Sequence, residues 1–318
     1  MIERGIKMKD LKVIFMGTPD FCVPILKALS EKCNVIAVVT QPDKEVGRKK
    51  EISYSPIKKT AIGLGIKVLQ PVKIKEEYKE IIDLNPDIII TCAYGQIVPE
   101  VILNYPKYGC INVHASLLPK LRGGAPIHKA IIYGYDVTGI TIMYMDKGMD
   151  TGDMISKKEV KIEDNDTAET LHDKLQKISV TLLLETLPKI ISGTNKREKQ
   201  DDNCATYAYN ISRQEEHVDF NKTSKEVFNQ IRGLNSWPGA YAVLDDKNIK
   251  LWLSKISENH YDAKPGTIVN LDKNGMEIVT KDGSVLITEL QLPGKRKTNI
   301  KDFINGVKKE DYLDKRFR

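Results

Sequence analysis

Short apolar runs alternate with helix-like segments over residues 1–191 of this chain. Apolar runs bounded by turn residues are typical of buried strands, and strands that alternate with helices usually form parallel sheets. The clearest of these runs are residues 13–16, 34–40, 87–92 and 110–113. The alternation predicts an α/β fold with a parallel, twisted sheet over residues 1–191.

The pattern changes after a polar segment at residues 192–208, which has no apolar period and is expected to be a linker. From residue 209 onwards, a helix is expected at 224–234, and short β-like runs then recur at a regular spacing. Such spacing predicts a small antiparallel β-barrel over residues 209–318. The β-like runs are residues 241–244, 249–254, 266–270, 276–280 and 285–290.

Composition excludes several classes of protein and site. The five cysteines include no Cys-x-x-Cys pair, and no apolar run approaches the ~20 residues of a transmembrane helix, so a reduced, cytoplasmic protein is expected. No set of His, Cys and Asp has metal-ligand spacing. The turn after the first strand, Gly17 to Asp20, lacks the Gly-x-Gly-x-x-Gly that binds dinucleotides.

Polar side chains gather where the run at residues 110–113 ends. Asn112 and His114 are two residues apart, so on a strand they face the same side. Ligands of open α/β sheets bind at the carboxyl ends of the strands. Asp150, in a glycine-flanked turn, is able to reach the same place. An amide, an imidazole and a carboxylate together can hold a carbonyl oxygen, stabilise its developing charge and manage a proton. Arg122 in the same loop either holds the loop or meets a phosphate.

These residues also carry a resemblance to a known family. Asn-Val-His-x-Ser-Leu-Leu-Pro from Asn112, followed by Met-Asp-Thr-Gly-Asp-Met from Met149, closely resembles the folate-dependent formyltransferases, above all those that act on methionyl-tRNA. Residues 13–21 (Val-Ile-Phe-Met-Gly-Thr-Pro-Asp-Phe) and 41–48 (Gln-Pro-Asp-x-x-x-Gly-Arg) resemble the same enzymes. The resemblance implies a Rossmann-like catalytic domain at 1–191, the linker at 192–208 and an OB-like, tRNA-binding domain at 209–318.

The resemblance implies a reaction and its residues. A formyl group passes from 10-formyltetrahydrofolate, the co-substrate, to the α-amine of methionyl initiator tRNA by direct attack of the amine. It assigns catalysis to Asn112, His114 and Asp150, with no metal. It assigns folate contacts to Ser116, Leu117, Leu118 and Pro119.

The segment 41–55 is a long, basic and polar stretch, which predicts a functional loop. In the family, this loop enters the acceptor arm of the initiator tRNA, which implies tRNA contacts for Arg48, Lys49 and Lys50. Arg48 occupies the Gly-Arg position of the family, whereas Lys49 stands where a second glycine is common. A solvated basic loop remains the alternative. The resemblance also implies a monomer, and the lack of a long apolar run predicts no membrane contact.

Two rival interpretations stay open. Sugar-nucleotide amine formyltransferases, the hydrolase part of formyltetrahydrofolate dehydrogenase and glycinamide ribonucleotide formyltransferase use the same Asn, His and Asp with folate. They would act on folate without binding tRNA. A tRNA-binding protein that has lost catalysis would bind tRNA without turnover.

Overall fold

The computed structural model describes residues 7–46 and 51–318, and its chain divides into two compact units. Unit 1 consists of the described residues up to Pro126 together with 138–161 and 172–208. Unit 2 consists of 127–137, 162–171 and 209–318. Unit 2 therefore includes two segments that precede residue 192. The domain boundaries expected from the sequence stay a prediction.

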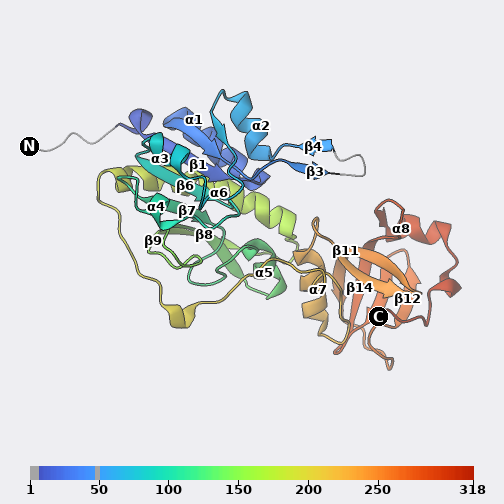
Figure 1. Cartoon of the computed structure of the whole chain (residues 1–318). Coiled ribbons are helices and arrows are strands. Elements are labelled where there is room, and N and C mark those ends of the chain that lie inside the picture. The colour runs from blue at the N-terminus through green and yellow to red at the C-terminus, as the bar shows by residue number, and fades with distance from the viewer. Residues whose placement is uncertain (1–6, 47–50) are drawn as a thin grey trace, which may run out of the picture. The chain divides into compact units, whose positions relative to one another are not determined.

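The alternating segments of unit 1 build a largely parallel sheet, which confirms the expected α/β class (Figure 1). The pairs β1–β2, β2–β5, β1–β6 and β6–β7 are all parallel. The order of the strands across the sheet is β5 (Val68–Leu69), β2 (Asn34–Val39), β1 (Lys12–Gly17), β6 (Ile88–Cys92), β7 (Cys110–His114), β8 (Val137–Tyr144) and β9 (Met154–Lys161).

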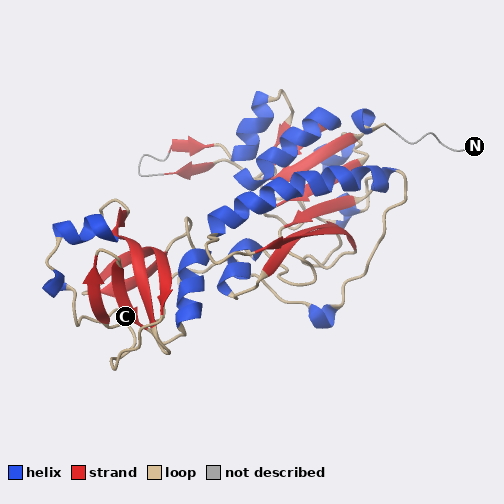
Figure 2. Ribbon diagram, turned by 180° about the vertical axis from the view of Figure 1, so that it is seen from behind, coloured by secondary structure: helices blue, strands red, loops and turns tan. Residues whose placement is uncertain are grey.

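Helices cover both faces of this sheet. Ile14 and Met16 of β1 belong to one buried cluster with Ile81 of α3 (Lys79–Asp83) and Ile102 of α4 (Glu100–Leu103). Because side chains alternate along a strand, Val13 and Phe15 face the opposite side. Figure 2 shows α1 (Val23–Lys32) and α6 (Ala168–Ile191) along that side.

Three segments differ from the sequence-based expectations. β8 runs antiparallel to β7, with His114 opposite Thr141, because the chain re-enters the sheet at the edge where β7 ended. Between β5 and β6, where the alternation of strands and helices predicts a helix, the helix α3 has only five residues, and the amide of Ile74 ahead of it donates to the side chain of Gln96 at 3.0 Å. The expected loop at 41–55 contains a two-stranded ladder, β3 (Lys44–Val46) with β4 (Glu51–Ser53), before α2 (Pro56–Gly63).

In unit 2, the helix α7 (Ser224–Gly233) is followed by the expected antiparallel sheet. The helix begins with a capping box in which the Thr223 and Glu226 side chains bind each other's backbone amides. The strand order is β10 (Ala240–Leu244), β11 (Lys247–Ser257), β14 (Ser284–Gln291), β13 (Gly275–Val279) and β12 (Ile268–Asp272), with β15 (Thr298–Asn299) beside β14 and α8 (Ile300–Phe303) after it.

The last residues of the chain close this sheet. Arg318 and Val243 of β10 exchange backbone hydrogen bonds of 2.8 and 3.0 Å. On the other side, Phe317 N donates to Gly266 O, and Ile268 N of β12 donates to Lys315 O, both at 2.9 Å. The tail thus joins the two end strands, and the buried ring of Phe317 enters the core. Closure of this kind removes exposed strand edges, as in a barrel.

Candidate active site

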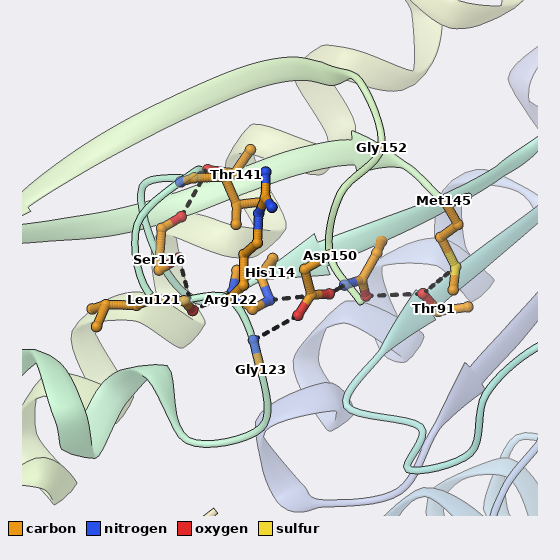
Figure 3. Close-up of polar contacts among 12 residues, drawn as sticks. Thr91, His114, Ser116, Leu121, Arg122, Gly123, Thr141, Met145, Asp150 and Gly152 are labelled. Carbon is orange, nitrogen blue, oxygen red and sulfur yellow. Dashed lines mark hydrogen bonds and ion pairs between the residues drawn. The ribbon is translucent and has the colours of Figure 1, made fainter. Parts of the chain in front are cut away.

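The predicted trio comes together at the carboxyl edge of the unit 1 sheet. β7 presents the half-buried Asn112 and the buried His114 on one side. Asp150 reaches them from the turn between β8 and β9 (Figure 3). Asp150 Oδ1 lies 3.5 Å from Asn112 Nδ2 and 3.7 Å from His114 Nδ1. The amide of Asn112 and the ring nitrogen of His114 therefore converge on one carboxylate oxygen of Asp150.

The turn that carries Asp150 is fixed by partners distant in sequence. Asp150 has a left-handed backbone, with φ of 55°. Its Oδ2 accepts from the amide of Gly123 at 2.8 Å, and Gln200 Nε2 donates to the carbonyls of Asp150 and Gly152, each at 2.8 Å. Gly123 itself must be glycine, because a Cβ there would lie 2.9 Å from the carbonyl oxygen of Ala208 and its φ is 115°.

The ring of His114 has a defined tautomer. Its Nε2 lies 3.0 Å from the carbonyl oxygen of Leu121. A carbonyl oxygen only accepts, so Nε2 carries a proton and donates it. In the neutral ring the lone pair is then on Nδ1, the atom that faces Asp150. The site can therefore accept a proton at Nδ1, and the carboxylate stabilises the resulting cation.

The amide of Asn112 is also held from behind. The hydroxyl of Thr91, on the neighbouring strand β6, lies 2.9 Å from Asn112 Oδ1. Amide oxygens only accept, so Thr91 donates and the NH₂ group of Asn112 points towards Asp150. Thr91 was not predicted from the sequence, where it is one polar residue in an apolar strand.

Arg122 holds the loop. It is 2% exposed, its Nε donates to Gln200 Oε1 at 3.0 Å, and its Nη2 pairs with Asp202 at 2.8 Å. The backbone of Arg122 also pairs with Thr206 and Ala208. Of the two alternatives for Arg122, the buried guanidinium with its protein partners supports the structural one. The expected linker thereby becomes part of the site, and no local motif marked Gln200 or Thr206 for that role.

The predicted folate segment divides into inward-facing and accessible residues. Ser116 is fully buried and donates to the carbonyl of Lys120 at 2.6 Å. Leu118 packs with Met143 and Met154, and its amide donates to Thr141 Oγ1 at 3.1 Å. Leu117 and Pro119 stay partly exposed. Only these two side chains of the segment offer surface to a ligand.

The predicted tRNA contacts lie in the basic segment between β3 and β4. Arg48, Lys49 and Lys50 lie outside the described residues, between β3 and β4. The base of this hairpin is anchored, because Asp43 pairs with Lys58 at 2.5 Å and accepts from Gln70 at 2.9 Å.

Within residues 7–46 and 51–318, no group of three or more His, Cys, Asp or Glu side chains has the arrangement of a metal site. No helix in that part of the chain is long and apolar enough to span a membrane.

Comparison with known proteins identifies the family. Residues 11–187 match the formyl transferase family, and residues 210–308 match the formyl transferase C-terminal domain. A structure of an N-formyltransferase from Helicobacter canadensis, in complex with folinic acid and dTDP-3-aminofucose, superposes with a TM-score of 0.65. It is 23% identical and covers 87% of this chain and 98% of its own, which supports the fold alone.

Two curated relatives are far more similar in sequence. A methionyl-tRNA formyltransferase from Macrococcus caseolyticus is 54% identical over 94% of this chain and 96% of its own length. One from Bacillus subtilis is 51% identical over 93% and 95%, respectively. The chain belongs to the formyl transferase family, and within it to the methionyl-tRNA formyltransferases.

Proposed function

We propose that this chain transfers a formyl group from 10-formyltetrahydrofolate to the α-amine of methionyl initiator tRNA, giving formylmethionyl-tRNA. One observation carries the proposal: Asn112 Nδ2 and His114 Nδ1 both lie within 3.7 Å of the same carboxylate oxygen of Asp150. The same residues lie in a chain that is 54% identical to a methionyl-tRNA formyltransferase over nearly its whole length.

The reaction defines what the site must do. The amine nitrogen attacks the formyl carbon, and the carbonyl oxygen becomes an oxyanion. The bond from that carbon to N10 of the folate then breaks; the amine loses a proton, and N10 gains one. No protein nucleophile takes part, so the protein supplies charge stabilisation and proton transfer.

Asn112 is the donor for the oxyanion. Its NH₂ group points into the site towards Asp150, and its oxygen accepts from Thr91 on the other side. An oriented amide donor of this kind acts on the charge that develops in the transition state, and losing one typically costs ~10²–10³ in rate.

His114 and Asp150 manage the proton. The Nδ1 lone pair takes a proton from the attacking amine and returns it to N10 as the carbon–nitrogen bond breaks. Asp150 Oδ1, 3.7 Å from Nδ1, stabilises the ring while it is charged. The bond from Nε2 to Leu121 keeps the ring in this orientation throughout.

The folate binds beside this trio, against Leu117 and Pro119. Their partly exposed side chains suit the apolar rings of the co-substrate, as ligand pockets usually do. Ser116 and Leu118 support the loop from within through their buried contacts. Arg48, Lys49 and Lys50 contact phosphates at the acceptor end of the tRNA.

The choice of acceptor amine tests this proposal. Purified protein with 10-formyltetrahydrofolate should formylate charged initiator tRNA and leave a dTDP-amino sugar unmodified. Formylation of the amino sugar without formylation of tRNA would reject the proposed acceptor. Release of free formate with neither acceptor would indicate a hydrolase instead.

A further inference from the structure

We propose that Thr91 is a positioning residue for formyl transfer, because its hydroxyl fixes the plane of the Asn112 amide. The inference rests on the function proposed above and extends it to a residue behind the catalytic trio. Thr91 touches neither the substrate nor the reacting atoms, and it acts only through Asn112.

The strand register places Thr91 for this role. β6 and β7 pair in parallel with Thr91 directly beside Asn112. Thr91 is 3% exposed, so its hydroxyl must find its partners within the protein. Asn112 Oδ1 is the nearest acceptor, at 2.9 Å.

The other acceptors compete poorly for the single hydroxyl proton. Met145 Sδ lies at 3.1 Å, and a thioether sulfur is a weak acceptor. The backbone carbonyl of Ile111 is farther away, at 3.2 Å. The proton is therefore directed to the amide of Asn112.

Asp150 and Thr91 divide the task of orienting that amide. A carboxylate only accepts, so Asp150 selects which end of the amide faces the site. The contact between Asn112 Nδ2 and Asp150 is long, at 3.5 Å, and leaves the amide plane loosely fixed. The terminal torsion of asparagine is broad, so a second anchor is needed to hold the plane. Thr91 provides this anchor from the opposite end.

The anchor acts on the transition state more than on binding. An oxyanion donor must lie about 2.7–3.1 Å from the developing charge, and a rotated amide loses that distance. Folate and tRNA binding do not depend on the plane of one amide. Loss of the Thr91 hydroxyl should therefore lower kcat and leave KM largely unchanged.

The matched pair Thr91→Val and Thr91→Ser tests this inference. Valine keeps the shape of threonine without the hydroxyl, and serine keeps the hydroxyl without the methyl group. We expect Thr91→Val to lower kcat for methionyl-tRNA roughly five- to tenfold, the size of one hydrogen bond, with KM within about twofold. Thr91→Ser should restore kcat to near the wild-type value. If Thr91→Val does not fold, Thr91→Cys, with a weak thiol donor, should give an intermediate kcat.

A double-mutant cycle separates positioning from a general structural effect. In an Asn112→Ala background, measured in single-turnover assays, Thr91→Val should cause no further loss, since the amide it positions is gone. An equal loss in both backgrounds, or no rescue by serine, would overturn the inference. A fully active Thr91→Val would do so as well, while leaving the proposed function intact. A wild-type protein that formylates no tRNA would reject the function and this inference with it.

Discussion

The carboxylate of Asp150 divides its two oxygens between the proposed chemistry and support of the loop. Oδ1 faces Asn112 and His114, while Oδ2 accepts from the amide of Gly123 at 2.8 Å. Support and chemistry thus depend on one side chain whose backbone is itself left-handed. At the residue scale, the arrangement of the site therefore depends on both Asp150 oxygens keeping their separate partners.

Replacement of Asp150 by asparagine should separate these two roles. The amide oxygen can still accept from Gly123, but the negative charge beside His114 is lost. We expect kcat to fall roughly 10²-fold or more with little change in melting temperature. The same substitution at Asp153, whose side chain pairs with Arg197 instead, is the matched control and should retain activity. Equal activity of the two variants would contradict the role of Asp150.

Glu277 in unit 2 gives a pH-dependent prediction. The side chain is 2% exposed, and burial alone would raise its pKa, but donors from Ser257, Tyr261 and Ser284, with Asn259, outweigh burial and lower the pKa. The stabilisation is therefore present above the unfolded pKa of about 4.3 and is lost as the pH falls through the lower folded pKa.

Urea unfolding of Glu277→Gln at several pH values measures this effect. The variant should be about 1–3 kcal/mol less stable than wild type at pH 7, and the difference should shrink below pH 4. Glu258→Gln, an exposed neighbour, should match wild type throughout. A difference for Glu277→Gln that does not change with pH would contradict the account.

At the scale of elements, residues 192–208 form a strap across the loop that carries Arg122 and the turn that carries Asp150. Thr206 and Ala208 pair with the backbone of Arg122, and Gln200 binds the turn that carries Asp150. A segment that the sequence predicts as a linker thereby fixes the turn that carries the Asp150 side chain.

Removal of the Gln200 side chain tests the strap. Gln200→Ala loses two bonds to the Asp150 turn and one from Arg122, so we expect a loss of about 1–2 kcal/mol in unfolding free energy and a fall in kcat. Lys199→Ala, at the exposed neighbouring position, controls for changes in the strap that do not touch the turn. Unchanged kcat in Gln200→Ala would show that the turn holds its shape unaided.

The C-terminal tail is a second element with a testable role. Phe317 is 3% exposed, so Phe317→Ala should cost about 3–5 kcal/mol through lost burial and a cavity. Arg318→Ala keeps the backbone bonds to Val243 and should stay close to wild type. Chemical denaturation of both variants measures the difference. Similar stability of the two would mean that the tail does not depend on its buried ring.

The sequence predicts these elements unevenly, for physical reasons. Buried parallel strands leave continuous apolar runs, so β1, β6 and β7 were predictable. The direction of β8 depends on where the chain re-enters the sheet, which leaves no local pattern. Asn112, His114 and Asp150 were predicted because their motifs are local. Gln200 is 50 residues from the Asp150 carbonyl that it binds, so only the tertiary structure reveals it.

At the scale of the whole molecule, the proposed reaction joins a small co-substrate with a large polyanion. The basic residues between β3 and β4 should then contribute to tRNA affinity through phosphate contacts. Arg48→Ala with Lys49→Ala should raise KM for tRNA, leave folate binding unchanged, and reduce the slope of log affinity against log salt by about two. Lys27→Ala with Lys32→Ala on α1 removes the same charge elsewhere. Equal tRNA kinetics in the two double variants would contradict a role of these basic residues in tRNA affinity.

Formyl transfer from 10-formyltetrahydrofolate to methionyl initiator tRNA by wild type, His114→Ala and His172→Ala tests the central claim most directly. His172 lies outside the trio, near Asp20 and Asp173. We predict that wild type and His172→Ala formylate the tRNA and that His114→Ala loses roughly 10²–10⁴-fold in kcat. Near wild-type transfer by His114→Ala would contradict the account, because among the described residues only the His114 ring is placed beside Asp150 to take the proton.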